Sequence, residues 1–292
     1  MPRFSHILFP VDFSKRCLAV RPFVKAAARQ FDAKVTLIHV IQIPVAWYGG
    51  TETAYPVAFD VSTMQEELRV ELGRFIDSER SPTSSHVREV VEHGDPATCI
   101  TEFVETNGVD LIMMPTHGYG RFRSLLLGSV AAKVLHDTKC PVWTAAPHGS
   151  DSNPPLHLSC KSMMCAIDTT PESLDIIGRA VDLASQYRAT LRLVHAVQAA
   201  GPPSSQDAGE PFTRFLLQAA REEITALQKK AGTDFELCLD AGGASAVVHA
   251  AAVHHDVDLV IIGRGKQNEI LGRLRSHAYA IIRDAPCPVL SV

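Results

Sequence analysis

The stretch HILFPVD at residues 6–12 recurs as SMMCAID at residues 162–168, in each case a short apolar run that ends in aspartate. The two aspartates are 156 residues apart, at 12 and 168, and the stretch CPV recurs after 147 residues, at 140–142 and 287–289. A repeat of about half the chain indicates one duplicated folding unit. The sequence therefore predicts two tandem domains, residues 1–146 and 160–292, joined by a linker at 147–159 that is rich in Gly, Ser, Asp, Asn and Pro.

Composition excludes several classes of protein. The chain has 292 residues, of which 46% are hydrophobic and 21% charged, enough apolar material for two cores of ordinary domain size. The net charge of −4, without a long basic run, argues against a nucleic-acid partner. The apolar run at 6–9 is too brief for a signal peptide, and no segment is apolar for long enough to span a bilayer. We expect a cytoplasmic protein with no membrane partner.

The cysteines and histidines give little sign of a metal or redox site. The seven cysteines form no CxxC pair, which is typical of reduced thiols in a cytoplasmic protein. His254 and His255 crowd with Asp256 and Asp258, but Asp258 is explained more simply as the residue that opens the strand at 259–262. We expect no bound metal.

The first half alternates strands with helices. The predicted strands are 7–11, 35–41, 87–91, 110–114 and 142–145. Helix starts are indicated by Ser14 as a cap, by Thr63 with Glu66 as a capping box, by Asp95-Pro96 and by Ser129. Such alternation implies right-handed crossovers and a parallel, doubly wound sheet.

The second half repeats this pattern. Its predicted strands are 163–167, 191–197, 235–239, 259–262 and 289–292, and its predicted helices include 171–187, 212–230 and 244–254. The insert at 201–209 is low in apolar residues and is predicted to be mobile. The predicted fold is thus α/β, with two doubly wound domains that each contain a five-stranded parallel sheet flanked by helices.

In such a sheet, ligands bind beyond the carboxyl ends of the strands, where the strand order reverses. Asp12 follows the first strand, and Gly118 and Gly120 follow the fourth. Gly128-Ser129 lies at the N-terminus of the next helix, where free backbone N–H groups, a hydroxyl and the positive helix end favour the binding of a phosphate. The alternative is that these glycines serve turn conformation alone.

These residues together resemble the universal stress protein family. The family motif is glycine, two residues, glycine, nine residues, then glycine followed by serine or threonine. Gly118, Gly128 and Ser129 match it, while Pro115 stands at the first glycine. The resemblance extends to PVDFS at 10–14, to GDP at 94–96, to DLIMM at 110–114 and to both halves. It implies a tandem member with the adenine nucleotide alpha hydrolase-like fold.

The resemblance implies a bound ATP, with or without Mg²⁺, or another adenine nucleotide. By position, Asp12 contacts the adenosine, the Val40 backbone contacts adenine, and Gly118, Gly128 and Ser129 hold the phosphates. The other residues implied to line the site are Pro10, Val11, Met114, Pro115, His117 and Val130. Asp12 also has a simpler interpretation as a polar strand end, and His117 as a solvated loop residue.

The second half departs from the motif. Asp168 keeps the adenosine position and Gly263 keeps the glycine that Pro115 replaces, but Arg275-Ser276 stands where Gly128-Ser129 stood. An arginine hinders close backbone approach, although Arg273 and Arg275 are suited to bind an anion through their side chains. We expect weak ATP binding or none here, and a site for a different anion is the alternative.

Three functional hypotheses remain. The first is a stress-response sensor or regulator controlled by nucleotide binding. The second is an enzyme on the same fold, at most a slow ATPase. Ligases of related nucleotide-binding α/β folds adenylate their substrates with an SGGxDS loop after the first strand, where this chain has VDFSKR and IDTTPE, and no nucleophile elbow or Walker lysine is present. The third is a ligand-free scaffold whose halves pair through the strands at 142–145 and 289–292. The resemblance implies that these strands make a pseudo-dimer; a homodimer and an unidentified protein partner stay open.

Overall fold

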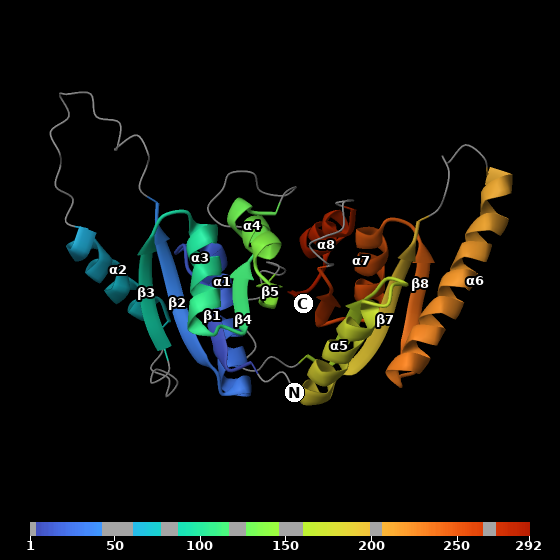
Figure 1. The fold of residues 1–292 in the computed structure, drawn as a ribbon, viewed down its shortest axis with the longest axis horizontal. Helices are drawn as coiled ribbons and strands as arrows, with labels where there is room; N and C mark the ends of the chain where they lie inside the picture. The colour runs from blue at the N-terminus through green and yellow to red at the C-terminus, as the bar shows by residue number, and fades with distance from the viewer. Residues whose placement is uncertain are drawn as a thin grey trace, which may run out of the picture.

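The computed structural model describes residues 4–42, 61–76, 87–116, 127–145, 160–198, 206–264 and 273–292. Strands and helices alternate along each half (Figure 1). The elements of the first half are β1 His6–Pro10, α1 Lys15–Phe31, β2 Lys34–Ile41, α2 Val61–Ile76, β3 Val87–His93, α3 Pro96–Asn107, β4 Leu111–Pro115, α4 Ser129–Asp137 and β5 Val142–Ala145. Those of the second half are β6 Ser162–Ala166, α5 Ser173–Tyr187, β7 Thr190–Val197, α6 Gln206–Ala231, β8 Glu236–Ala241, α7 Ala244–His254, β9 Leu259–Ile262, α8 Arg273–Asp284 and β10 Val289–Ser291.

The described strands form one sheet with the order β3-β2-β1-β4-β5-β10-β9-β6-β7-β8. All pairs within a half are parallel, and each half has the predicted five strands. The order reverses beside β1, which lies between β2 and β4, and beside β6, which lies between β7 and β9. The predicted doubly wound fold is confirmed, and a crevice is expected at each reversal.

The two halves join through β5 and β10, which pair antiparallel. Trp143 lies opposite Leu290, and these are equivalent residues of the repeat, 147 positions apart. The side chains add reciprocal bonds, because Thr144 Oγ1 donates to the Val289 carbonyl at 3.1 Å and Ser291 Oγ to the Val142 carbonyl at 3.3 Å. The predicted pairing of the terminal strands is confirmed, and it has the self-complementary geometry of an isologous dimer interface.

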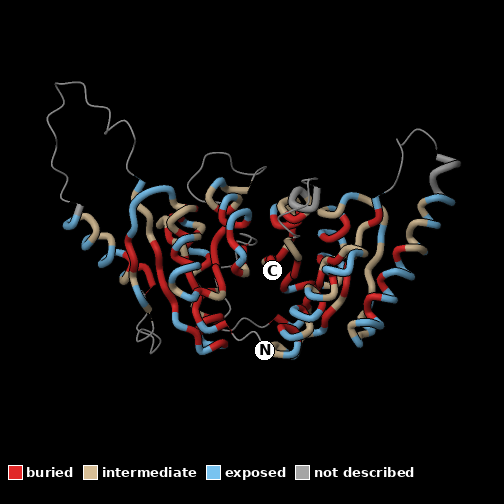
Figure 2. The backbone as a smooth tube through the Cα atoms, in the orientation of Figure 1, coloured by how far each residue is buried: buried red, intermediate tan, exposed pale blue. Residues whose placement is uncertain are grey.

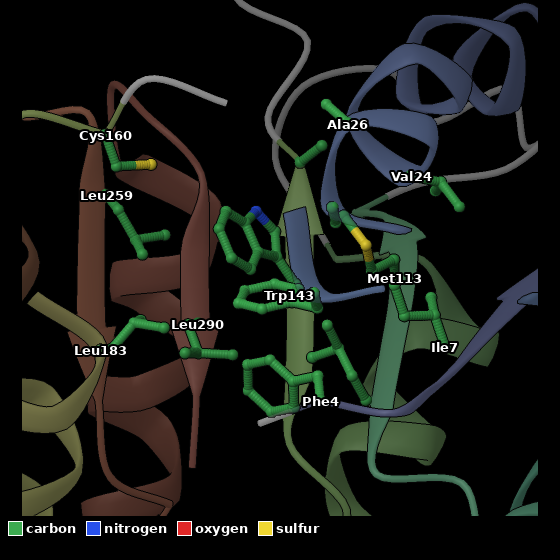
Figure 3. Close-up of a cluster of buried hydrophobic side chains, with 14 of the residues drawn as sticks. Phe4, Ile7, Val24, Ala26, Met113, Trp143, Cys160, Leu183, Leu259 and Leu290 are labelled. Atoms are coloured by element: carbon green, nitrogen blue, oxygen red, sulfur yellow. The ribbon is translucent and has the colours of Figure 1, made fainter. Parts of the chain in front are cut away.

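An apolar core continues across this junction. Burial is concentrated along the sheet in both halves (Figure 2). Trp143 is 1% exposed and lies between the strands of the two halves, facing Leu290, with Phe4 beside it (Figure 3). Arg264 of the second half adds a polar clamp, donating to the carbonyls of Thr138 at 2.8 Å and Cys140 at 2.6 Å, and burial lowers its pKa to about 10.

Helix ends follow the predicted capping residues in two cases. Ser14 Oγ accepts a hydrogen bond from the Cys17 amide at 3.2 Å, and Asp95 Oδ1 accepts one from the Thr98 amide at 3.0 Å. Helix α3 then ends at Gly108, whose φ of 62° is the left-handed conformation that favours glycine.

One local prediction was wrong, and one helix begins earlier than predicted. Thr63 lies inside α2, two residues after its first described residue, so Thr63 and Glu66 do not cap the start of that helix. Helix α6 begins at Gln206, so residues 206–209 of the insert predicted to be mobile are helical, six residues before the predicted helix start at 212. Residues 201–205 lie outside the described part of the chain.

Within the ranges that the structure describes, no helix combines the length and the apolar character needed to cross a membrane.

Candidate functional site

A cavity of about 870 Å³ lies in the first half, where β1, β2 and β4 end. It extends between the first turn of α3 and the N-terminus of α4. Its lining includes Pro10, Val11, Asp12, Val40, Met114, Pro115, Gly128, Ser129 and Val130. The fold therefore brings together every residue predicted for this site that the structure describes; His117 and Gly118 lie outside the described residues.

The floor of the cavity is mainly apolar. Ile38 and Met114 are buried and Val40 is half-buried, so the ends of β2 and β4 present hydrocarbon together with backbone groups. An apolar cavity with a few polar groups at its edge is the usual form of a small-molecule site. A flat aromatic ring fits such a floor.

Asp12 is presented by a turn that directly follows β1. The Val11 amide still pairs with the Ile38 carbonyl at 2.8 Å, and Asp12 Oδ1 accepts a hydrogen bond from the Ser14 amide at 2.9 Å. Phe13, between Asp12 and Ser14, has φ of 57°, a left-handed conformation that is unfavourable for a residue with a side chain. Its ring packs against His39 at 4.9 Å and Phe75 at 5.8 Å between ring centres. Strain of this kind is found where function requires a particular backbone.

His39 also lines the cavity, although no motif in the sequence predicted a role for it. Its Nδ1 lies 2.7 Å from the Val11 carbonyl oxygen, and His195 Nδ1 lies 2.8 Å from the Ile167 carbonyl oxygen in the second half. A carbonyl only accepts, so in both cases Nδ1 carries the proton. His39 and His195 are 156 residues apart, as are the two aspartates, and this shared offset was the available signal. Each histidine ties the second strand of its half to the turn that carries the aspartate.

The N-terminus of α4 is the part of the site suited to an anion. Gly128 is the N-cap and makes no side-chain capping bond, while its own amide donates to the Thr116 carbonyl at 2.9 Å. The amides of the first helical turn thus have no side-chain oxygen at the cap to accept from them. With the helix dipole and the adjacent Ser129 hydroxyl, they offer an anion several donors at one point.

The second half has a smaller cavity, of about 340 Å³, at the equivalent place. Asp168 lies there, but its Oδ1 accepts hydrogen bonds from the Thr170 amide at 2.9 Å and from Ser173 Oγ at 2.7 Å. The residue equivalent to Ser173 in the first half is Cys17, whose thiol is 3.7 Å from the Pro10 carbonyl oxygen. The aspartate of the second half is therefore held more tightly by its own helix start.

Gly263 lies against the Ile176 side chain of α5 in the second half. A Cβ added at Gly263 would lie 2.2 Å from Ile176 Cδ1, so a larger residue there would require the end of that side chain to move. Arg273, Arg275 and Ser276 belong to the first turn of α8, and the structure describes their backbone but not their side chains.

No group of three His, Cys, Asp or Glu residues in the described ranges is arranged to hold a metal ion. The rings of His254 and His255 pack edge to face, with 4.8 Å between their centres.

Comparison with known proteins gives two matches along the chain. The sequence profile of the Universal stress protein family matches residues 3–145 and 160–292. Universal stress protein A homolog 1 of Coxiella burnetii is 32% identical over 145 residues, which cover 48% of this chain and 94% of that protein. A universal stress protein of Methanocaldococcus jannaschii is 28% identical over 139 residues, covering 48% of this chain and 80% of that protein.

A crystal structure of a universal stress protein from Archaeoglobus fulgidus matches the whole arrangement. It covers 98% of this chain and 95% of its own, with a TM-score of 0.63 and 19% sequence identity. At that identity the likeness shows the fold, and it extends to both halves.

Proposed function

This chain belongs to the universal stress protein family, and from that premise we propose that its first half binds ATP or another adenine nucleotide. The protein then acts as a cytoplasmic sensor or regulator in the stress response. The observation that carries the proposal is the first cavity. It gathers Asp12, Val40 and the Gly128-Ser129 helix start, which come from three separate parts of the sequence, around a space large enough for a nucleotide.

The lining suggests how the nucleotide lies. The adenine ring packs on the apolar floor and meets backbone groups at Val40, and the ribose hydroxyls meet the Asp12 carboxylate. The phosphates lie at the N-terminus of α4, where amides, the Ser129 hydroxyl and the helix dipole favour negative charge.

The second half is proposed to bind ATP weakly or not at all. Its cavity has less than half the volume of the first, and the Asp168 carboxylate already accepts three hydrogen bonds, two from Thr170 and one from Ser173. Arg275 also replaces the glycine at the start of the last helix. The domain boundaries at 146 and 160 are proposed together with this division of roles.

A ligand-free scaffold is the second candidate function. The pairing of the two halves at the junction supports it, whereas the first cavity does not. Strands β5 and β10 pair with each other, which leaves β3 and β8 as the outer strands of the described sheet. A homodimer or a protein partner that adds a strand would therefore do so at β3 or β8.

Titration calorimetry of the whole chain with ATP and Mg²⁺ tests the proposal. We expect one ATP bound per chain. Two sites would contradict the assignment of the second half. Absence of heat at several temperatures, together with no rise in melting temperature when ATP is added, would contradict nucleotide binding and favour the scaffold.

Ser129→Ala should weaken ATP binding several-fold, because a hydroxyl that donates to a phosphate contributes about 1 kcal/mol. Ser129 is exposed at the first position of α4, so its loss is not expected to disturb folding. Calorimetry gives the dissociation constant, and Ser185→Ala, another exposed helical serine outside the cavity, is the matched control. Equal affinities for the two variants would mean that the Ser129 hydroxyl does not meet the phosphates.

A further inference from the structure

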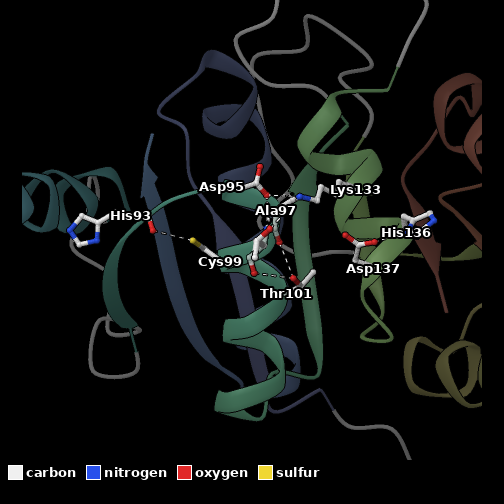
Figure 4. A network of polar contacts seen from close by, with 9 residues as sticks. His93, Asp95, Ala97, Cys99, Thr101, Lys133, His136 and Asp137 are labelled. Atoms are coloured by element: carbon white, nitrogen blue, oxygen red, sulfur yellow. Dashed lines mark hydrogen bonds and ion pairs between the residues drawn. The ribbon is translucent and has the colours of Figure 1, made fainter. Parts of the chain in front are cut away.

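Lys133 of α4 bridges to the start of α3 beside the first cavity. Its Nζ lies 2.8 Å from Asp95 Oδ1 and 3.2 Å from Thr98 Oγ1, and Figure 4 shows the side chains of Lys133 and Asp95 meeting between the two helices. Neither the family motif nor the site predicted from the sequence includes this pair. It joins the two helices whose first turns contribute to the lining of the cavity.

The position of the pair places Lys133 near the proposed phosphate site. Pro96, which follows Asp95, lines the cavity, and so does Ser129, which lies four residues before Lys133 on the same face of α4. Helical side chains lean toward the N-terminus of their helix. The Lys133 side chain therefore leans toward the end of α4 that carries Gly128 and Ser129, and its length and flexibility allow the ammonium group to turn from Asp95 toward that end.

Lys133 is free to exchange partners. The side chains of Lys133 and Asp95 are 48% and 54% exposed, and ion pairs this exposed are weak. The Asp95 carboxylate also accepts hydrogen bonds from the amide of Thr98 at 3.0 Å and from its hydroxyl at 2.8 Å. It keeps these donors when the lysine leaves, so the start of α3 does not depend on Lys133.

The second half provides an internal comparison. The N-cap of α7, equivalent to Asp95, is Gly243, and the residue equivalent to Lys133 is Ala280. Both members of the pair are absent from the half in which Arg275 replaces the phosphate-site glycine. The pair occurs in the half that has the larger cavity and the glycine helix start.

We propose that Lys133 selects for the phosphate chain of the nucleotide: it leaves Asp95 and contacts the phosphates held at the start of α4. Asp95 acts as the resting partner that keeps the ammonium group beside the site. This inference rests on the proposed function, since it assigns a residue to the phosphate end of that same site. An ammonium–phosphate contact is charge-assisted and therefore strong.

The test compares ATP with adenosine, which lacks phosphates. Lys133→Met should weaken ATP binding about tenfold in calorimetry and leave adenosine binding within about twofold, because a hydrogen bond to a charged group is worth that much. Lys133→Arg should restore most of the ATP affinity. Lys139→Met removes the same charge from an exposed site beyond the other end of α4 and should change neither affinity.

A second variant separates phosphate contact from helix support. Asp95→Asn keeps an oxygen that accepts from the Thr98 amide but releases Lys133, so ATP affinity should hold or rise. An equal loss of ATP affinity in Asp95→Asn and Lys133→Met, or an equal loss for adenosine and ATP, would overturn the proposal. If the wild type binds ATP and Lys133→Met binds it with the same affinity, this inference alone is overturned. If the wild type binds neither ATP nor adenosine, the proposed function is overturned as well.

Discussion

Gly128→Arg should abolish ATP binding by the first half, with an affinity loss of at least about 100-fold, because several charge-assisted hydrogen bonds to phosphate are lost together. The substitution copies the residue that the second half has at this place, Arg275. A side chain at the N-cap of α4 obstructs the close approach of a phosphate to the amides of the first turn. Gly128 has φ of −58° and ψ of 142°, a conformation open to any residue, so the backbone is not strained.

The control for this prediction is Gly243→Arg, which adds the same side chain at a helix N-cap of the other half. Gly243 is exposed, has φ of −70°, and a Cβ added there meets nothing within 4 Å. We expect its ATP affinity and stoichiometry to equal those of the wild type, and both variants to melt near the wild-type temperature. Undiminished ATP affinity in Gly128→Arg would remove α4 from the site and with it the proposed place of the phosphates.

The sequence predicts the strand and helix order well because the signals are local. Apolar runs, Ser14 and Asp95 as caps, and Gly108 at a helix end each act within a few residues. Because the sequence is repeated, each strand and helix is predicted twice, once in each half. Since parallel strands bring their carboxyl ends to one edge, Asp12 and the glycines after the fourth strand are predicted to share a site with Gly128 at the next helix start, whereas Val40 is assigned to that site only by the family resemblance.

Other features depend on contacts between distant segments, and no local pattern reveals them. The hydrogen bond of His39 to the Val11 carbonyl exists only once β2 lies beside β1. Gly263 stands at the first glycine of the family motif, but the side chain next to it, Ile176, belongs to a helix almost ninety residues earlier in the sequence.

Trp143→Ala should lower the free energy of unfolding by about 4 kcal/mol, the usual cost of replacing a fully buried large aromatic residue by alanine. Trp143 is 1% exposed and lies at the junction, opposite Leu290. Urea unfolding followed by circular dichroism measures the change. Trp143→Phe is the control and should cost less than about 1.5 kcal/mol, because Trp143 Nε1 is buried without a hydrogen-bond partner in the described structure and its removal leaves no group unpaired.

The partner residue makes the prediction specific to the junction. Leu290→Ala should cost about 2–5 kcal/mol alone, and the double variant should cost less than the sum of the two single variants, because the first cavity already removes the contact that the second would lose. Strict additivity would mean that the two side chains stabilise their own halves independently. A coupling of 0.5 kcal/mol or more would show that the halves depend on each other for stability, as self-complementary pairing of β5 with β10 requires.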